Sequence, residues 1–340
     1  MPNKPLVTIC IPHYNNKKTI SETLDSLLSQ TYKNIIIKVF DNASTDNSMD
    51  ILKEYEKRYK NIQVFQNEVN IGGEANFTKC IENLEGEYGA VFHADDVYLP
   101  DMVSKQVVFL EQYKECSAVA THGHVINEES KKVGLRPLPL KFILEQDNII
   151  EGELELLQNL LEYGNFITCP SVMGRVDIYK KKIQFWNGSD YKTSADLDVW
   201  LRFAKYGSFG IISEPLIMYR QSLSSFSYKD MQTRTSANNM FLVLDSYMKK
   251  YHNILSDTDR ARYDFLLCKD NVNRTINSIL QNKTSSLNIT CFTKSMLSIA
   301  ISSKANFKIY FIAILVKIIR NLPLPKLIQE QIFNYRFRRG

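Results

Sequence analysis

Short runs of β-branched and aromatic residues alternate with amphipathic helical patterns over the first hundred residues of this 340-residue chain. This alternation predicts successive βαβ units around a largely parallel sheet, because parallel strands need a crossover that a helix usually supplies. Thr19 and Glu22 have the spacing of a capping box at the first helix. Strands are predicted at residues 6–11, 35–40, 62–65 and 90–92, and helices at residues 20–28, 49–59 and 77–84. We therefore expect an α/β fold that begins with a Rossmann-like half-domain.

The pattern changes twice further along the chain. Residues 114–220 mix strand and helix signals, and from about residue 229 the pattern is helical to the end. We expect one α/β domain over residues 1–225, followed by a helical C-terminal region over residues 226–340. The elements predicted in the middle are strands at 117–121 and 211–212 and helices at 152–161 and 197–206.

Charge and cysteine spacing exclude some classes of protein. The net charge of +5 comes from residues 304–340, which hold eight Lys and Arg against Glu330, whereas the rest of the chain carries −2. A nucleic-acid-binding protein is therefore disfavoured, because its basic residues would not be confined to one end. The six cysteines have neither the paired spacing of a disulfide framework nor that of a zinc site. The first residues also lack the build of a secretory signal, which favours the cytoplasm.

Unusually polar segments follow the predicted strands, at the edge where open α/β sheets bind ligands. In chain order they read IPHYNN, DNASTDNS, NEVNIGGEAN and HADD, and a fifth segment, SADLDVW, leads into the helix predicted at 197–206. In order and spacing these segments resemble the inverting glycosyltransferases of family 2, which have the GT-A fold with a Rossmann-like, mostly parallel sheet. The resemblance covers residues 5–225. It implies a nucleotide-sugar-binding half at residues 1–113 and an acceptor half at residues 114–225.

The resemblance implies a nucleoside site at the first two polar segments. It assigns Pro12, Tyr14 and Asn15 to a turn that flanks the nucleoside, and Asp41 to a carboxylate that accepts a hydrogen bond from the base. Asp41 also has an alternative role in capping the next helix, since Asp, Asn and Ser satisfy free N–H groups at helix starts.

The third polar segment contains Asn70, Gly72 and Gly73. The resemblance places these residues near the donor. Their composition alone predicts only a loop in which glycine permits close approach of the backbone. Both interpretations are left open.

His93, Asp95 and Asp96 occupy the place of the family's DxD-type metal motif. Adjacent carboxylates at a strand end supply the oxygen ligands that suit Mn²⁺ or Mg²⁺, and the resemblance implies that the ion contacts the donor diphosphate. It gives the metal-binding role to Asp95, with Asp96 nearby, and has His93 contact the ion or the ribose. His93 is a departure, because the family usually has an aspartate there. Without the resemblance, two aspartates after a strand would be read as a solvated turn.

Asp196 matches the family's catalytic base, which takes the proton from the acceptor hydroxyl. General base catalysis needs a carboxylate within hydrogen-bond reach of that hydroxyl, and a helix N-terminus can hold one in position. The alternative is that Asp196 only caps the helix. Ala195 stands where the family usually has a glutamate, Asp198 is expected to be structural, and Arg202 is expected to form an ion pair or to face the diphosphate.

Relatives often place a histidine soon after the residue equivalent to Arg220, where it completes the metal site, and residues 221–225 contain none. The tightness of metal binding is therefore left open. The other histidines are expected to be structural or loop residues, and they are His13, His122, His124 and His252.

The C-terminal tail combines an apolar helix side with basic residues. The longest apolar run, residues 309–316, is too short to cross a bilayer, which takes about 20 residues. A basic amphipathic helix suits attachment to an anionic membrane surface; packing on the protein's own core or on a second copy is the alternative. The apolar side is formed by Phe307, Tyr310, Phe311, Ile314, Leu315, Ile318 and Ile319.

The sequence therefore predicts an enzyme that transfers a sugar from a nucleotide-diphospho-sugar, with UDP-sugar as the default, to an acceptor hydroxyl with inversion. The family implies synthesis of surface polysaccharide or another glycoconjugate, and the tail suggests a lipid-linked glycan acceptor at the cytoplasmic face of the membrane. The departures at His93 and Ala195, and the missing histidine after Arg220, support one alternative. This is a nucleotide-sugar-binding or scaffold protein of the same fold with weakened catalysis.

Overall fold

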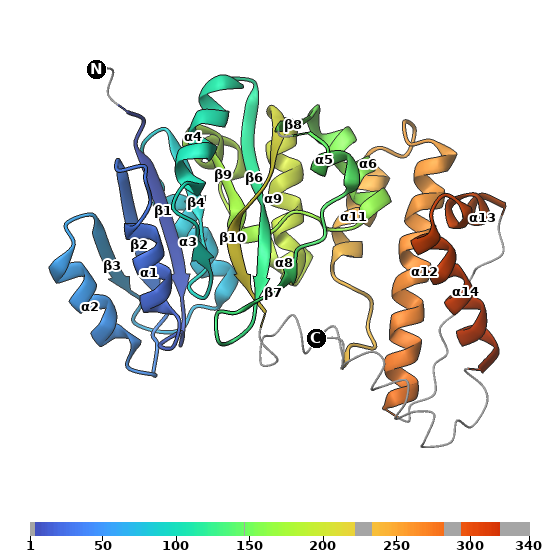
Figure 1. Ribbon diagram of the computed structural model, residues 1–340, viewed down its shortest axis with the longest axis horizontal. Helices are drawn as coiled ribbons and strands as arrows, with labels where there is room; N and C mark the ends of the chain where they lie inside the picture. Colours follow the sequence, from blue (N-terminus) through green and yellow to red (C-terminus); the bar gives the residue numbers. More distant parts are fainter. Residues whose placement is uncertain (1–3, 146, 222–232, 282–293, 320–340) are drawn as a thin grey trace. The chain divides into compact units, whose positions relative to one another are not determined.

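The computed structural model describes residues 4–145, 147–221, 233–281 and 294–319 (Figure 1). The chain divides into two compact units, one formed by Met1–Leu157 with Asn165–Gln221 and the other by Gln158–Gly164 with Ser222–Gly340. The predicted boundary between residues 225 and 226 lies outside the described residues and stays a prediction.

The first unit is built on a sheet in which the strands run in the order β3-β2-β1-β4-β9-β6-β10-β5. Its amino-terminal half is parallel. There, β1 (Val7–His13) pairs with β2 (Ile35–Asp41) and β4 (Tyr88–Val91), and β2 pairs with β3 (Ile62–Gln66). Nearly all of β1 is buried, as expected for an inner strand covered on both faces.

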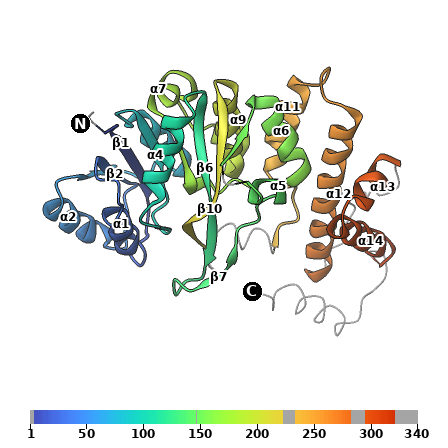
Figure 2. The same ribbon diagram turned by 45° about the horizontal axis from the view of Figure 1, so that its top comes forward.

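The other half of the sheet is mixed. The strand β9 (Val172–Arg175) runs antiparallel to β4 and to β6 (Cys116–Ile126), whereas β10 (Ser208–Arg220) runs parallel to β6. Short strands complete it: β5 (Val97–Tyr98) and β8 (Asp147–Ile150) pair with β10, and β7 (Lys132–Leu135) pairs with one end of β6 (Figure 2).

The helices of the first unit bury apolar side chains against this sheet. In α1 (Ile20–Leu28), for example, Leu24 and Leu27 join the core formed by Ile9, Ile37 and their neighbours. The predicted α/β class, with a mostly parallel central sheet flanked by helices and a helical C-terminal region, is confirmed. The other helices of the first unit are α2 (Ser48–Arg58), α3 (Gly73–Glu82), α4 (Met102–Gln112), α5 (Leu140–Ile143), α7 (Val176–Ile178), α8 (Gly188–Tyr191) and α9 (Ala195–Lys205). The helix α6 (Gly152–Tyr163) begins in the first unit, and its residues from Gln158 onward belong to the second.

The predicted capping box at α1 is wrong. Thr19 is the N-cap residue, but its side chain makes no capping hydrogen bond. Its hydroxyl donates instead to the carbonyl of Ala94, and Glu22 forms an ion pair with Arg220. Tertiary partners have therefore replaced the local pairing that the spacing predicted.

The second unit consists of helices in the part that the structure describes. They are α11 (Met240–Lys250), α12 (Asp257–Leu280), α13 (Lys294–Ile301) and α14 (Lys304–Ile319), and α13 and α14 lie beside α12 (Figure 2). Ser256 and Asp259 form a capping box at the start of α12. None of the helices among the described residues is long and apolar enough to span a membrane.

Helix α14 is apolar on two sides. Ala313 and Val316 are buried in a core that they share with Phe265 and Val272 of α12. The opposite side leaves large apolar side chains exposed, at Phe307, Phe311, Leu315 and Ile318. One side of α14 therefore packs on the protein's own core, while the other side leaves apolar side chains exposed. The basic residues of the tail from Arg320 onward lie outside the described residues.

Candidate active site

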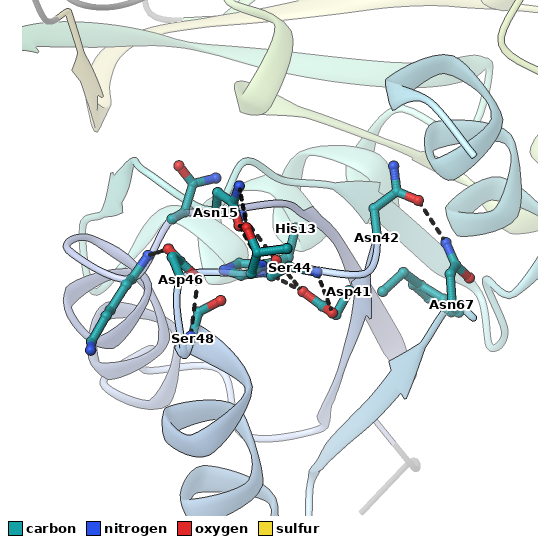
Figure 3. Close-up of polar contacts among 12 residues, drawn as sticks. His13, Asn15, Asp41, Asn42, Ser44, Asp46, Ser48 and Asn67 are labelled. Carbon is teal, nitrogen blue, oxygen red and sulfur yellow. Dashed lines mark hydrogen bonds and ion pairs between the residues drawn. The ribbon is translucent and has the colours of Figure 1, made fainter. Parts of the chain in front are cut away.

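The carboxyl ends of β1 and β2 carry a buried polar cluster (Figure 3). His13 and Asp41 are paired across the two strands, and Nδ1 of His13 lies 2.8 Å from Oδ1 of Asp41. Ser44 donates its hydroxyl to the same oxygen and its backbone N–H to Oδ2. Burial alone would raise the pKa of Asp41, but the hydrogen bonds from His13 and Ser44 hold it below its ordinary value. Asp41 is therefore an ionised carboxylate with no exposed surface.

The loops after β1 and β2 are tied to one another. Asn15, at a φ of 52°, accepts a hydrogen bond from the backbone of Thr45 and donates its own N–H to Ser44. Tyr14 is 45% exposed and Pro12 is half-buried, so their side chains remain accessible for contact with a ligand. The structure thus brings Pro12, Tyr14 and Asn15 together beside Asp41, and their role toward a nucleoside stays a prediction.

An asparagine network that the sequence analysis did not identify shapes the third loop. Asn42 donates to Oδ1 of Asn70 at 2.9 Å and accepts from Asn67 and from the backbone of Ile71. The same Asn70 oxygen accepts the N–H of Gly72, whose φ of +86° favours glycine. These contacts fix the loop that precedes α3, whereas contact of Asn70 or Gly72 with a donor is untested.

The turn after β4 gathers possible metal ligands. Ligand atoms of His93, Asp95 and Asp96 all lie within 4.8 Å of one another. Among the described residues, Nε2 of His93 and Oδ2 of Asp96 are buried without a hydrogen-bond partner. Burial raises the pKa of Asp96 well above its ordinary value, with a further contribution from the charge of Asp95, and burial lowers the pKa of His93. Two carboxylates and an imidazole with unsatisfied atoms fit a divalent cation such as Mn²⁺ or Mg²⁺.

Arg220, at the end of β10, holds this turn in place. Its backbone N–H donates to Oδ1 of Asp96, its Nε donates to the carbonyl of Asp95, and its guanidinium pairs with Glu22. It also donates to the carbonyl of Asn127. The sequence alone gives Arg220 no role beyond marking the position before the missing histidine. The segment after it, residues 222–225, lies outside the described residues.

Asp196 lies in the first turn of α9, two residues after the N-cap Ser194. Burial raises its pKa to about 6, although hydrogen bonds from the backbone of Leu197 and from Asn165 favour the charged form. Asp198 is buried and pairs with Arg202 at 2.8 Å, and Arg202 also donates to the carbonyl of Phe185. This ion pair is one of the two roles expected for Arg202, and it gives Asp198 a structural role.

Asp196 and the cluster after β4 interact electrostatically with the same neighbouring groups. Partial burial raises the pKa of the Cys169 thiol, and the charges of both Asp196 and Asp96 raise it further. Burial raises the pKa of both Asp96 and Asp196, and the positive charge of Arg136 lowers it in part, because it favours their ionised forms. Asp196 and Asp96 therefore share two electrostatic neighbours, Cys169 and Arg136.

Comparison with known proteins gives a family. Residues 8–197 match the family model described as Glycosyl transferase family 2. The chain is 29% identical over 228 residues to the putative glycosyltransferase EpsE of Bacillus subtilis (strain 168), covering 66% of this chain and 77% of that one. It is also 29% identical over 231 residues to the putative teichuronic acid biosynthesis glycosyltransferase TuaG of the same organism, covering 66% and 84%.

Solved structures share the fold. S. aureus TarS 1–349 in complex with UDP-GlcNAc superposes with a TM-score of 0.53 at 15% identity, covering 84% of this chain and 94% of that one. The mannosyltransferase PcManGT from Pyrobaculum calidifontis, in complex with GDP-Man and Mn²⁺, superposes with a TM-score of 0.56 at 13% identity, covering 94% and 88%. At these identities the likeness establishes the fold.

Proposed function

Because the chain belongs to glycosyl transferase family 2, we propose that it transfers a sugar from a nucleotide-diphospho-sugar to a hydroxyl of a glycan acceptor, with inversion at the anomeric carbon. UDP-sugar is the default donor, in line with a neighbour that was solved with UDP-GlcNAc; another was solved with GDP-Man. Synthesis of surface polysaccharide is the proposed setting, since a relative is named for teichuronic acid biosynthesis.

The observation that carries this proposal is the position of Asp196. Its pKa of about 6 leaves it mostly ionised at neutral pH yet basic enough to accept a proton. Cys169 and Arg136 interact electrostatically with both Asp196 and Asp96, which supports a base near the cluster that suits a metal-bound diphosphate. A base on one side and a leaving-group site on the other are the parts that a single displacement needs.

In the proposed reaction, Asp196 takes the proton of the acceptor hydroxyl while that oxygen attacks the anomeric carbon. The bond from this carbon to the phosphate oxygen breaks, and its electron pair stays on the phosphate, so the configuration inverts. His93, Asp95 and Asp96 would hold the divalent ion, which supplies positive charge to the diphosphate. Arg220 keeps the backbone of Asp95 and the side chain of Asp96 in place for this role.

The nucleoside is proposed to lie at Pro12, Tyr14, Asn15 and Asp41, with Asn70 and Gly72 toward the donor. Asp41 has no exposed surface, and Ser44 occupies its carboxylate. A nucleobase therefore reaches this carboxylate only if the residues that cover it move.

We also propose a peripheral position on the cytoplasmic face of the membrane, with a lipid-linked acceptor. The support is the exposed apolar side of α14, formed by Phe307, Phe311, Leu315 and Ile318, next to exposed Lys304 and Lys308. Apolar side chains beside lysines suit the interface of an anionic membrane.

The transferase is tested by incubating the protein with UDP-, GDP-, dTDP- and CMP-sugars and Mn²⁺ or Mg²⁺, and measuring release of the free nucleotide. We expect release from one donor class, increased by a glycan acceptor. Binding of a donor without release under any condition would instead support the nucleotide-sugar-binding or scaffold alternative.

A further inference from the structure

Arg136 is held firmly by its backbone but not by its side chain. It follows β7 directly; its N–H donates to the carbonyl of Gly123 at 2.9 Å, and its own carbonyl lies 2.7 Å from Nε2 of His122. Its Nε atom is buried, and it has no hydrogen-bond partner among the residues that the structure describes. An unpaired buried donor destabilises the fold, so it points to an acceptor that arrives with a ligand.

The guanidinium of Arg136 lies at the candidate active site. Its carbon is 5.1 Å from the centre of the Tyr219 ring, the distance of a cation–π contact that orients the group. Burial raises the pKa of Tyr219, and the charges of Asp96 and Asp95 raise it further. The charge of Arg136 favours the ionised forms of both Asp96 and Asp196, against the burial that raises their pKa. The charge of the guanidinium therefore reaches the two carboxylates, Asp96 and Asp196, that the proposed reaction uses.

Other arginines near the site already have partners. Arg220 is occupied by Glu22, by the carbonyl of Asp95 and by that of Asn127. Arg202 is occupied by Asp198 and by backbone carbonyls. Within the described part of the chain, Arg136 differs from both because no hydrogen bond or ion pair holds its side chain.

We propose that Arg136 binds the terminal phosphate of the nucleoside diphosphate, next to the sugar that is transferred. This rests on the proposed function and names a residue for it. A guanidinium matches phosphate oxygens with two parallel hydrogen bonds. Negative charge grows on this phosphate as its bond to the anomeric carbon breaks, and a fixed cation stabilises that charge. The other possible source of an anionic group is an acidic acceptor.

The experiment compares two ligands that differ by this phosphate. Binding of UDP and UMP, or of GDP and GMP if the wild type prefers guanine, is measured by calorimetry with Mn²⁺ for Arg136→Met. We expect the diphosphate to bind about 10- to 100-fold more weakly, as for loss of charged hydrogen bonds, and the monophosphate to bind within about twofold of the wild type. Lys132→Met, an exposed cation of the neighbouring strand, is the matched control and should change neither affinity.

Arg136→Lys keeps the charge but loses the planar fork, so it should recover only part of the affinity. It also gives a second test if Arg136→Met fails to fold. Unchanged diphosphate affinity, or equal loss for both ligands, would overturn the assignment. If diphosphate affinity is unchanged and the KM for an acidic acceptor rises, the guanidinium binds the acceptor instead. If the wild type binds no nucleoside diphosphate, the proposed function fails together with this inference. If the wild type binds the diphosphate more tightly than the monophosphate but Arg136→Met does too, only this inference fails.

Discussion

Asp196 is the residue on which the proposed chemistry depends. One substitution distinguishes its role as a catalytic base from a purely structural role at the start of α9. Asp196→Asn keeps the size of the side chain and much of its ability to accept hydrogen bonds from the first turn of α9. If Asp196 is the base, turnover should fall by about 10²-fold or more, as expected for removal of general base catalysis, while donor affinity is retained. A turnover within a few-fold of the wild type would leave Asp196 only a structural role in the first turn of α9. Asp198→Asn is no equal control, because Asp198 holds Arg202.

The pKa of Asp196 also predicts a pH dependence. Because burial raises that pKa to about 6, the base is protonated below this pH, and kcat/KM should fall about tenfold per pH unit there. The raised pKa works against stability, since the folded state disfavours the charge, so the free energy of unfolding decreases as pH rises from about 4 to about 6. Asp196→Asn should therefore lose the acidic limb of the rate profile and melt no lower than the wild type at pH 7. A limb near pH 6 that persists in the variant would contradict the assignment.

Asp95 is predicted to be a metal ligand. Asp95→Ala should weaken metal-dependent nucleotide binding by at least about 10-fold, because it removes an oxygen from the cluster with His93 and Asp96. Calorimetry with and without Mn²⁺ measures this effect. Asp50→Ala removes an exposed carboxylate of α2 and should leave the affinity unchanged. Equal affinities for Asp95→Ala and the wild type would exclude Asp95 as a ligand.

The site residues that the sequence analysis found are those in runs that follow strands or open helices. His93, Asp95 and Asp96 come together because one turn contains them all. Arg136 and Arg220 were not given a role, because their partners lie far along the chain; Arg220, for example, reaches Glu22 and Asp95. Pairing of this kind appears only once the sheet has brought distant loops to one edge.

The membrane role proposed for helix α14 is tested better by point substitutions than by deleting the tail. Deleting the helix would remove Ala313 and Val316 from the core that they share with α12. Replacing Phe311 and Leu315 by Asp changes only exposed positions, and it should move the protein from the pellet to the supernatant when it is sedimented with anionic vesicles. Val133→Asp changes an exposed apolar residue of β7 and should have no effect. Undiminished sedimentation of the double variant would exclude this side of α14 as the membrane contact.

The elements show where sequence patterns are reliable. The strands at residues 7–13, 35–41 and 62–66 appear within two residues of their prediction, because each has a strong run of β-branched residues between polar segments. The short strands β5 and β7 were missed, since such short segments are fixed by their partners in the sheet. The capping box predicted at Thr19 is absent because its two side chains bond to distant partners. Thr19 donates to the carbonyl of Ala94, and Glu22 pairs with Arg220.

At the scale of the molecule, the sequence was sufficient for the α/β class and the helical C-terminal region. The order of the strands beyond β4 was not predictable, because β9 inserts between β4 and β6 although nearly fifty residues separate it from β6 in the chain. That insertion brings Cys169, in the turn that directly precedes β9, within electrostatic reach of both Asp96 and Asp196. The site is therefore a product of the whole sheet.

The stereochemistry of the product tests the single displacement between Asp196 and the diphosphate site. An α-linked donor selected from the nucleotide-release screen is incubated with acceptor, and the anomeric coupling of the transferred sugar is read by proton NMR. The account predicts a β-linked product from the wild type and about 10²-fold less of it from Asp196→Asn. An α-linked product would show retention and contradict the proposed reaction.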